Sequence, residues 1–223
     1  MASGDLPRTR VHLVRHGEVE NPEGVLYGRL AGYRLAERGE LMAARVAEWF
    51  AGQDGRERAD VAVVVASPLE RAQQTATPVA DAFGVTLDTD EDLIEAANHF
   101  EGLTFGRGDG SLLRPRHWPY LRNPWRPSWG EPYTEQVARM TQAVRRARAR
   151  AEGREAVLVS HQLPIWVTRL HLERRRLAHD PRHRECSLAS VTTLTFEGAT
   201  LLSLTYSEPA RDLLPSGPTV PGA

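Results

Sequence analysis

The chain has 223 residues, of which 41% are hydrophobic, and its formal net charge at pH 7 is −1. This length and composition fit one globular domain with a substantial core, and the near-neutral charge excludes bulk attraction to nucleic acid or to an anionic membrane. All 28 basic residues are arginine, so no lysine can form a Schiff base or serve a P-loop, and the single Cys186 excludes an internal disulfide framework.

The sequence shows no segment for membrane insertion or export. Its longest uninterrupted apolar run, residues 61–66, is far shorter than the roughly 18 residues that a membrane span needs. The first ten residues lack the apolar core of a signal peptide. We therefore expect a soluble, cytoplasmic protein in a reducing compartment, with no nucleic-acid or membrane partner, and the sequence leaves the oligomeric state open.

Apolar runs and helical periodicity alternate along the chain. In chain order they predict a strand at 11–14, a helix at 35–52, a strand at 61–66, helices at 68–84 and 135–153, a strand at 156–160, and a hairpin of strands at 190–196 and 200–206. The helix at 68–84 is expected to carry a proline in its first turn and to end at Gly84. The pattern predicts an α/β fold whose mainly parallel sheet is covered by helices on both sides, with the hairpin at one edge.

The boundaries follow from the same pattern. We expect one domain over residues 10–207, with flexible segments at 1–9 and 208–223. The region from about 98 to 133 contains three of the five tryptophans, many prolines and glycines, and little periodicity. Such an insertion is typical of a binding loop or lid, although its aromatic side chains could equally form a small packing cluster.

Three of the predicted strands end in polar side chains. Arg15 and His16 follow the first strand, the second leads into "SPLERAQQT" with Arg71, and the third ends at Ser160 and His161. Because ligands of parallel sheets bind beyond the carboxyl ends of the strands, we expect these side chains to converge. Two guanidinium groups can bind phosphate oxygens, while one imidazole donates a hydrogen bond and the other acts as nucleophile.

Five segments carry a resemblance to a known family. In order and spacing, they resemble the histidine phosphatase superfamily, also called the phosphoglycerate mutase-like family: "LVRHGE" (13–18), "YGRLAGYRLAERG" (27–39), "SPLERAQQTA" (67–76), "DLIEAANHFEG" (92–102) and "VLVSHQ" (157–162). The resemblance implies a three-layer sandwich, phosphoglycerate mutase-like, with a mainly parallel central sheet flanked by helices.

The resemblance also implies a two-step phosphoryl transfer through a phosphohistidine. His16 would attack the phosphorus in line, and Arg15, Arg71 and His161 would hold the equatorial oxygens. Glu95 matches the acid that protonates the leaving alcohol and then deprotonates the attacking water. This scheme requires no metal or other cofactor, and its partner is a small phosphorylated molecule.

Other positions carry weaker assignments. Gly17 is expected to allow a tight backbone turn beside the nucleophile. The sequence departs from the family twice: many members have asparagine six residues after the nucleophile, where this chain has Pro22 after Asn21, and many have glycine where this chain has Gln162. Gln162 could instead donate to phosphate.

Possible substrate contacts complete the predicted site. They are Asn21, Tyr27, Gly28, Glu101 and Trp129. Glu101 is the second carboxylate near Glu95, and we expect it to stabilise the loop.

The sequence disfavours two other classes of hydrolase. A cysteine phosphatase needs arginine six residues after its cysteine, but Thr192 stands at that distance from Cys186. A zinc hydrolase could use His179 and His183, but the intervening Pro181 disfavours a helical pair, so we expect no metal site.

Two relatives of the predicted phosphatase remain as alternatives. A phosphoglycerate mutase-type transferase would need an extended lid that shields the phosphohistidine, and its pattern is absent from this chain. A non-catalytic phosphate-binding member of the same fold would usually have lost one of the histidines or arginines that are present here. We therefore predict hydrolysis of a small phosphomonoester, whose identity the sequence leaves open.

Overall fold

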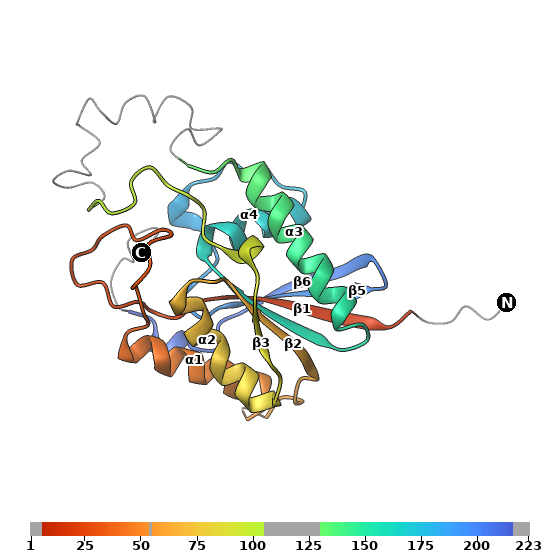
Figure 1. The fold of residues 1–223 in the computed structure, drawn as a ribbon. Coiled ribbons are helices and arrows are strands. Elements are labelled where there is room, and N and C mark those ends of the chain that lie inside the picture. The colour runs from red at the N-terminus through yellow and green to blue at the C-terminus, as the bar shows by residue number, and fades with distance from the viewer. Residues whose placement is uncertain (1–5, 54, 105–129, 216–223) are drawn as a thin grey trace.

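The computed structural model describes residues 6–53, 55–104 and 130–215, which form one six-stranded sheet with helices on both faces (Figure 1). The elements are, in chain order, β1 (Arg8–Arg15), α1 (Glu37–Phe50), β2 (Val61–Ala66), α2 (Glu70–Phe83), β3 (Leu87–Thr89), η1 (Glu91–Leu93), α3 (Tyr133–Arg150), β4 (Glu155–Ser160), α4 (Gln162–Leu172), η3 (Pro181–His183), β5 (Val191–Glu197), β6 (Thr200–Ser207) and η4 (Arg211–Leu213).

The sheet has the strand order β3-β2-β4-β1-β5-β6. The first four of these strands are parallel, whereas β5 runs antiparallel to β1 and β6 runs antiparallel to β5. In the centre, Leu13 of β1 lies opposite Leu158 of β4. The mainly parallel α/β sheet and the late hairpin at its edge are therefore confirmed.

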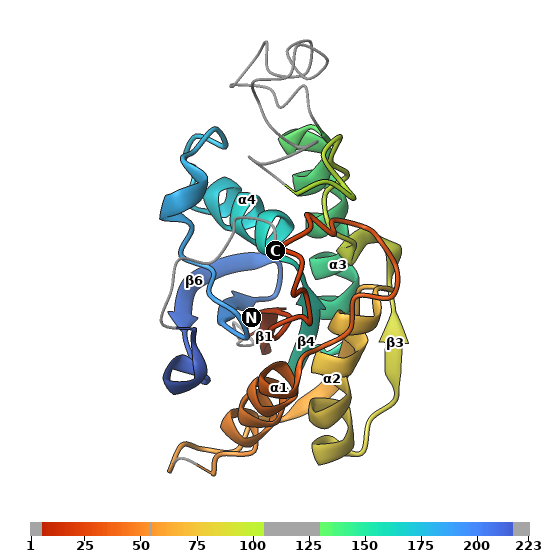
Figure 2. The same ribbon diagram turned by 90° about the vertical axis from the view of Figure 1, so that its left-hand side faces the viewer.

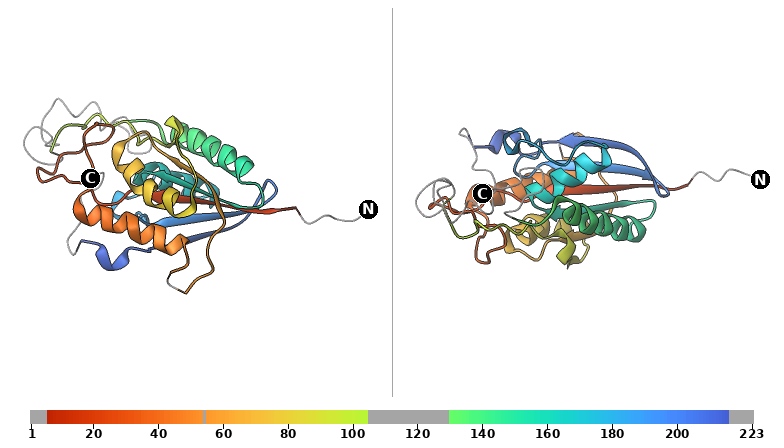
Figure 3. Two further views of the ribbon diagram at one scale, coloured as in Figure 1. Left: turned by 60° about the horizontal axis from the view of Figure 1, so that its bottom comes forward. Right: turned by 90° about the horizontal axis from the view of Figure 1, so that it is seen from above.

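Alternate residues of the central strands point to two apolar layers. On one face, Val14 and Val64 pack with α1 and α2, and Phe50 is among the residues buried there. On the other face, Leu13 and Leu158 pack with α3 and with the start of α4. In Figure 3, α1 and α2 are turned toward the viewer in the left view and α3 and α4 in the right view, so the two helical layers lie on opposite sides of the sheet. This arrangement is the predicted three-layer sandwich.

Strand β3 and helix α4 were not predicted, and α2 begins two residues later than expected. Strand β3 has only three residues, all at least partly exposed, so it gives no apolar run. Helix α4 buries residues on all sides, including Ile165, Trp166 and Leu170, so it lacks the polar face by which amphipathic helices are recognised. Helix α2 begins at Glu70 with Leu69 as its N-cap, which places the proline of "SPLERAQQT" before the helix and not in its first turn.

The chain continues to pack beyond residue 207. Ala210 is buried in the layer that contains α1, and Leu213 and Leu214 pack against the same layer. Residues 208–215 thus form part of the described fold. Across the described ranges, no helix combines the length and the apolar character needed to cross a bilayer.

Two glycines allow the end of β1 to approach the start of α1. A Cβ atom on Gly17 would lie 2.6 Å from the carbonyl oxygen of Gly39, and one on Gly39 would lie 2.0 Å from the carbonyl oxygen of Glu18. Gly17 is not among the residues with positive φ, so the close approach of the backbone, and not a left-handed conformation, requires glycine at this position. The contact fixes the backbone next to His16.

Replacing Gly39 with alanine separates helix propensity from packing. Propensity alone favours alanine over glycine in a helix by about 1 kcal/mol. We expect the opposite sign for Gly39→Ala, a loss of about 1–3 kcal/mol in the free energy of unfolding, because the added methyl group meets backbone atoms that cannot rotate away. Urea unfolding followed by circular dichroism measures the change, with Glu40→Ala on the exposed side of the same turn as the control. A more stable Gly39→Ala protein would contradict the close contact.

Candidate functional site

The polar strand ends meet at the carboxyl edge of the parallel strands, which faces the viewer in Figure 2. Arg15 ends β1 and His16 follows it, Ser67 follows β2, and His161 follows β4. Arg71 lies in the first turn of α2. All five are buried, with no more than 3% of their surface exposed. The predicted convergence of Arg15, His16, Arg71 and His161 is therefore present in the fold.

His16 is oriented by its own backbone neighbour. Its Nδ1 lies 2.7 Å from the carbonyl oxygen of Gly17, which can only accept, so Nδ1 carries the proton and Nε2 carries the lone pair of the neutral ring. Burial lowers the pKa of His16 well below its ordinary value, and the positive charges of Arg71 and Arg15 lower it further. The ring is thus neutral at pH 7 and can act as a nucleophile through Nε2.

His161 lies beside His16, with 5.1 Å between the ring centroids. Its Nε2 is 2.8 Å from the hydroxyl of Ser67, whereas its buried Nδ1 has no hydrogen-bond partner among the described residues. Burial, followed by the charge of Arg71, lowers the pKa of this imidazole well below its ordinary value. His161 is also the N-cap of α4, where the helix dipole favours an anion.

Backbone carbonyls hold the two guanidinium groups. Nη1 of Arg15 donates to the carbonyl of Cys186 at 2.8 Å, and Nη2 of Arg71 donates to the carbonyl of Gly28 at 2.6 Å. Arg71 also stacks on Tyr27, with its Cζ 4.6 Å from the ring centroid, and no described carboxylate pairs with it. Burial lowers the pKa of Arg71, but an arginine stays charged at neutral pH. Its positive charge therefore remains available to an anionic ligand.

Glu95 has the properties of a general acid. Burial raises the pKa of its carboxyl group, although the N–H of Ala96, at 2.8 Å, and the charges of Arg71 and Arg184 act in the opposite direction. A raised pKa lets a carboxyl group hold a proton nearer to neutral pH and deliver it to a leaving group.

A second carboxylate fixes the backbone that carries Glu95. Glu131 accepts from Nη2 of Arg29 at 2.8 Å and from Nε of Arg139 at 2.7 Å. Arg29 donates to the carbonyl of Glu95, and Arg139 donates to the carbonyl of Asp92, both at 2.7 Å. One partly buried carboxylate thus orients two arginines that hold both ends of the segment.

The remaining predicted contacts take different places. Both amide atoms of Asn21 bind the backbone of Val25, at 2.9 and 3.0 Å, so this side chain closes its own loop. Gln162 donates through Nε2 to the carbonyl of Cys186 at 3.3 Å. The Tyr27 ring is buried 6.4 Å from the His16 ring, measured between centroids, and forms a wall of the site.

Gly28 and Glu101 belong together. Gly28 has φ +40°, and a Cβ atom there would lie 2.3 Å from Oε1 of Glu101, which accepts from the N–H of Asn98 at 3.1 Å. Glu101 therefore packs in the loop next to the carbonyl that holds Arg71. Trp129 lies outside the described residues.

Four residues at the site were missed or given no role by sequence reasoning. Thr75 accepts from the N–H of Gly17 at 3.1 Å and donates to the carbonyl of Arg71 at 2.7 Å, which joins α2 to the backbone next to His16. Ser67 and Thr75 stand within the "SPLERAQQT" motif, whose spacing could have indicated them. Glu131 and Arg184 have no comparable local signal.

His179 takes part in hydrogen bonding within the protein. Its Nδ1 donates to the carbonyl of Leu177 at 2.7 Å, and its Nε2 accepts from Nε of Arg184 at 2.9 Å. Within the described ranges, no group of three or more histidine, cysteine, aspartate or glutamate residues is placed to hold a metal ion.

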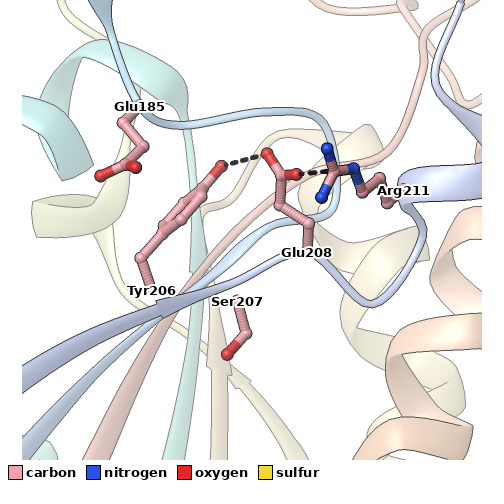
Figure 4. Close-up of a pocket in the computed structure, with 5 residues that line it drawn as sticks. All are labelled: Glu185, Tyr206, Ser207, Glu208 and Arg211. Carbon is pink, nitrogen blue, oxygen red and sulfur yellow. Dashed lines mark hydrogen bonds and ion pairs between the residues drawn. The ribbon is translucent and has the colours of Figure 1, made fainter.

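A separate pocket lies between β6 and the segment before β5 (Figure 4), lined by Glu185, Tyr206, Ser207, Glu208 and Arg211. The hydroxyl of Tyr206 accepts from the N–H of Ser187 and donates to Glu208, both at 2.9 Å. None of the residues that line it belongs to the histidine and arginine cluster. The hydrogen bond from Ser187 to Tyr206 holds the backbone next to Cys186, whose carbonyl accepts from Arg15.

Comparisons with known proteins agree with this geometry. The sequence profile of the histidine phosphatase superfamily (branch 1) matches residues 11–208. The uncharacterized protein Rv0525 of Mycobacterium tuberculosis is 54% identical over 202 residues, which cover 91% of this chain and 97% of that protein. The structure of YhfR from Bacillus stearothermophilus has a TM-score of 0.72 at 24% identity and covers 87% of this chain and 94% of its own.

A third similar protein has a stated activity. The mycobacterial glucosyl-3-phosphoglycerate phosphatase Rv2419c has a TM-score of 0.66 at 25% identity, and the match covers 84% of this chain and 90% of that one.

The buried imidazoles predict a loss of stability in mild acid. His16 and His161 remain neutral in the folded chain because their pKa values are lowered, whereas in the unfolded chain they take up protons near pH 6.5. The unfolded state then binds more protons, so the free energy of unfolding should fall by up to about 1 kcal/mol per histidine between about pH 7.5 and pH 5.5.

Urea unfolding at the two pH values measures this loss. His161→Asn should reduce it by one histidine's share, whereas His183→Asn, at an exposed position, should leave it as in the unaltered protein. A free energy of unfolding that does not change over this interval would contradict neutral, buried imidazoles.

Proposed function

Because the chain belongs to the histidine phosphatase superfamily (branch 1), we propose that it is a metal-independent phosphatase that hydrolyses a small-molecule phosphomonoester through a phosphohistidine on His16. The observation that carries the proposal is the neutral His16, whose ring, with its lone pair on Nε2, lies in a buried cluster with a second imidazole and two guanidinium groups. The similarity to a glucosyl-3-phosphoglycerate phosphatase supports a phosphorylated organic substrate.

In the first step, Nε2 of His16 attacks the phosphorus. The N–P bond forms while the bond from phosphorus to the ester oxygen breaks, and protonated Glu95 gives its proton to the departing alkoxide. Arg15 and Arg71 neutralise the three equatorial oxygens, and the unpaired Nδ1 of His161 is the ring atom left to donate to one of them. The hydrogen bond from Nδ1 to the Gly17 carbonyl disperses the positive charge that develops on the His16 ring.

In the second step, Glu95 acts as a base. Its carboxylate takes a proton from a water molecule, the water oxygen attacks the phosphorus, and the N–P bond breaks to release inorganic phosphate and regenerate neutral His16. The raised pKa of Glu95 makes its carboxylate a better base than an exposed glutamate, so the same shift serves both steps. Glu131 keeps this group in place through Arg29 and Arg139.

The nucleophile assignment predicts the effect of removing His16. The unaltered protein should release phosphate from p-nitrophenyl phosphate, in EDTA as well as without it, and His16→Ala should lower kcat by at least about 10³-fold. Brief exposure to a labelled ester should give an acid-labile, base-stable adduct on His16, and the exposed His183→Ala is the control.

Other outcomes point to the alternatives. Isomerisation of 3-phosphoglycerate, primed by 2,3-bisphosphoglycerate, that outruns phosphate release would identify a mutase. Binding of phosphate without turnover of any ester would identify a non-catalytic member of the fold.

The acid assignment predicts a dependence on the leaving group. Glu95→Gln should lower kcat/KM for an alkyl ester such as glycerol 3-phosphate by about 10²-fold or more, but should affect p-nitrophenyl phosphate far less, because p-nitrophenolate needs little protonation. Glu101→Gln is the matched control and should change both esters by a similar factor, since Glu101 binds its own loop. If Glu101→Gln lowered kcat/KM selectively for the alkyl ester, or if Glu95→Gln lowered it equally for both esters, Glu95 would not be the general acid.

A further inference from the structure

Arg184 is fixed at the border of the site by two side chains. Its Nε donates to Nε2 of His179 at 2.9 Å, and its Nη1 donates to Oε1 of Gln162 at 3.3 Å. His179 is itself fixed, because its Nδ1 donates to the carbonyl of Leu177 and its ring packs against Tyr133, with 5.6 Å between the ring centroids. The guanidinium plane is thus held by neutral acceptors in one orientation.

Arg184 forms no ion pair with a carboxylate of the described residues. The neighbouring arginines of this region do: Arg169 pairs with Glu173, and Arg182 pairs with Asp180. Arg184 is half-buried, and its Nη2 makes no hydrogen bond within the described part of the chain. A partly desolvated guanidinium is costly to leave unpaired, and its free N–H groups form an end that fits the two oxygens of a carboxylate.

Gln162 places Arg184 next to the phosphate-binding cluster. Its Oε1 accepts from Arg184, and its Nε2 donates to the Cys186 carbonyl, which also accepts from Arg15. One amide side chain therefore separates the two guanidinium groups. Gln162 directly follows His161, so the bridge is also joined to the cluster through the main chain.

Arg184 is close enough to Glu95 for their charges to interact. Its charge helps to lower the pKa of Glu95, and the charge of Glu95 acts on Arg184 in return. Under the proposed function, Glu95 contacts the ester oxygen. In the first step it is protonated and neutral, so it cannot neutralise Arg184 when the substrate is bound.

We propose that Arg184 binds a carboxylate on the alcohol portion of the substrate, so that the natural substrate is a phosphorylated carboxylic acid. This inference rests on the proposed function and adds the class of leaving group. A single guanidinium beside Glu95 suits a group with one negative charge better than a second phosphate dianion. His179 and Gln162 are positioning residues for Arg184.

The test compares two esters that differ only at one carbon. In 3-phosphoglycerate a carboxylate stands where sn-glycerol 3-phosphate has a hydroxymethyl group, and the phosphate ester is otherwise the same. The unaltered protein should have the higher kcat/KM for 3-phosphoglycerate. Arg184→Ala should lower the ratio of the two kcat/KM values by at least about tenfold, mainly through KM, because a charge-assisted pair is lost.

Two further variants complete the comparison. Arg184→Lys keeps the charge without the planar fork and should give an intermediate ratio. Arg182→Ala removes an exposed charge two residues away and should keep the ratio of the unaltered protein. Because the ratio is measured within each variant, turnover of glycerol 3-phosphate also shows that the variant has folded.

The outcomes separate this inference from the proposed function. Release of phosphate from both esters with a ratio that is the same in the unaltered protein and in Arg184→Ala would overturn the role of Arg184 and leave the phosphatase intact. Failure of the unaltered protein to hydrolyse glycerol 3-phosphate, 3-phosphoglycerate and p-nitrophenyl phosphate would overturn the proposed function, and this inference with it.

Discussion

Two guanidinium groups buried against backbone carbonyls set the chemistry of this fold. A carbonyl accepts a hydrogen bond without cancelling the charge of its donor, so Arg15 on the Cys186 carbonyl and Arg71 on the Gly28 carbonyl remain cationic in a region from which water is largely excluded. Burial lowers the pKa of the two neighbouring imidazoles, and the field of the guanidinium groups lowers it further and favours an incoming dianion. The free energy needed to bury these charges comes from the apolar layers on both sides of the sheet.

The opposite end of β1 shows how the same residue types behave when a carboxylate is added. There His12 is buried, but its Nε2 lies 2.8 Å from Glu155, which also accepts from Arg10 at 3.0 Å. The charges of that cluster are satisfied internally, and it joins β1 to β4 through their registered neighbours. His12 is therefore bound to a carboxylate, whereas the hydrogen-bond partners of the His16 and His161 rings are a backbone carbonyl and a hydroxyl.

The sequence could predict the elements that have a simple pattern. The valine-rich strands β2 and β4 are buried on both faces and read as continuous apolar runs, and α1, α2 and α3 show one apolar face each. Convergence at the carboxyl edge follows from parallel strands alone, so the sequence was enough to predict that Arg15, His16 and His161 lie close together. Helix α4 escaped this reasoning because tertiary burial, and not periodicity, stabilises it.

The supporting residues could not be predicted for a related reason. Glu131 acts on Glu95 through two arginines that are far apart in the chain, and Arg184 reaches the site through Gln162, so neither interaction has a local spacing. Such contacts depend on how loops cross one another in space, whereas sequence patterns report only on neighbours along one element. Sequence motifs therefore indicate the groups that would react, and the structure adds the residues that would orient those groups.

The use of main-chain oxygens has a consequence for how this site can change over evolutionary time. The carbonyl that orients Arg15 belongs to Cys186, but any residue at that position would present the same oxygen if the loop kept its course. A substitution at position 186 that the core accommodates without moving this segment therefore leaves the acceptor of Arg15 in place, whereas a deletion that shortens the segment before β5 would displace it. Through this hydrogen bond, selection acts on the path of the backbone more than on the identity of the residue at position 186.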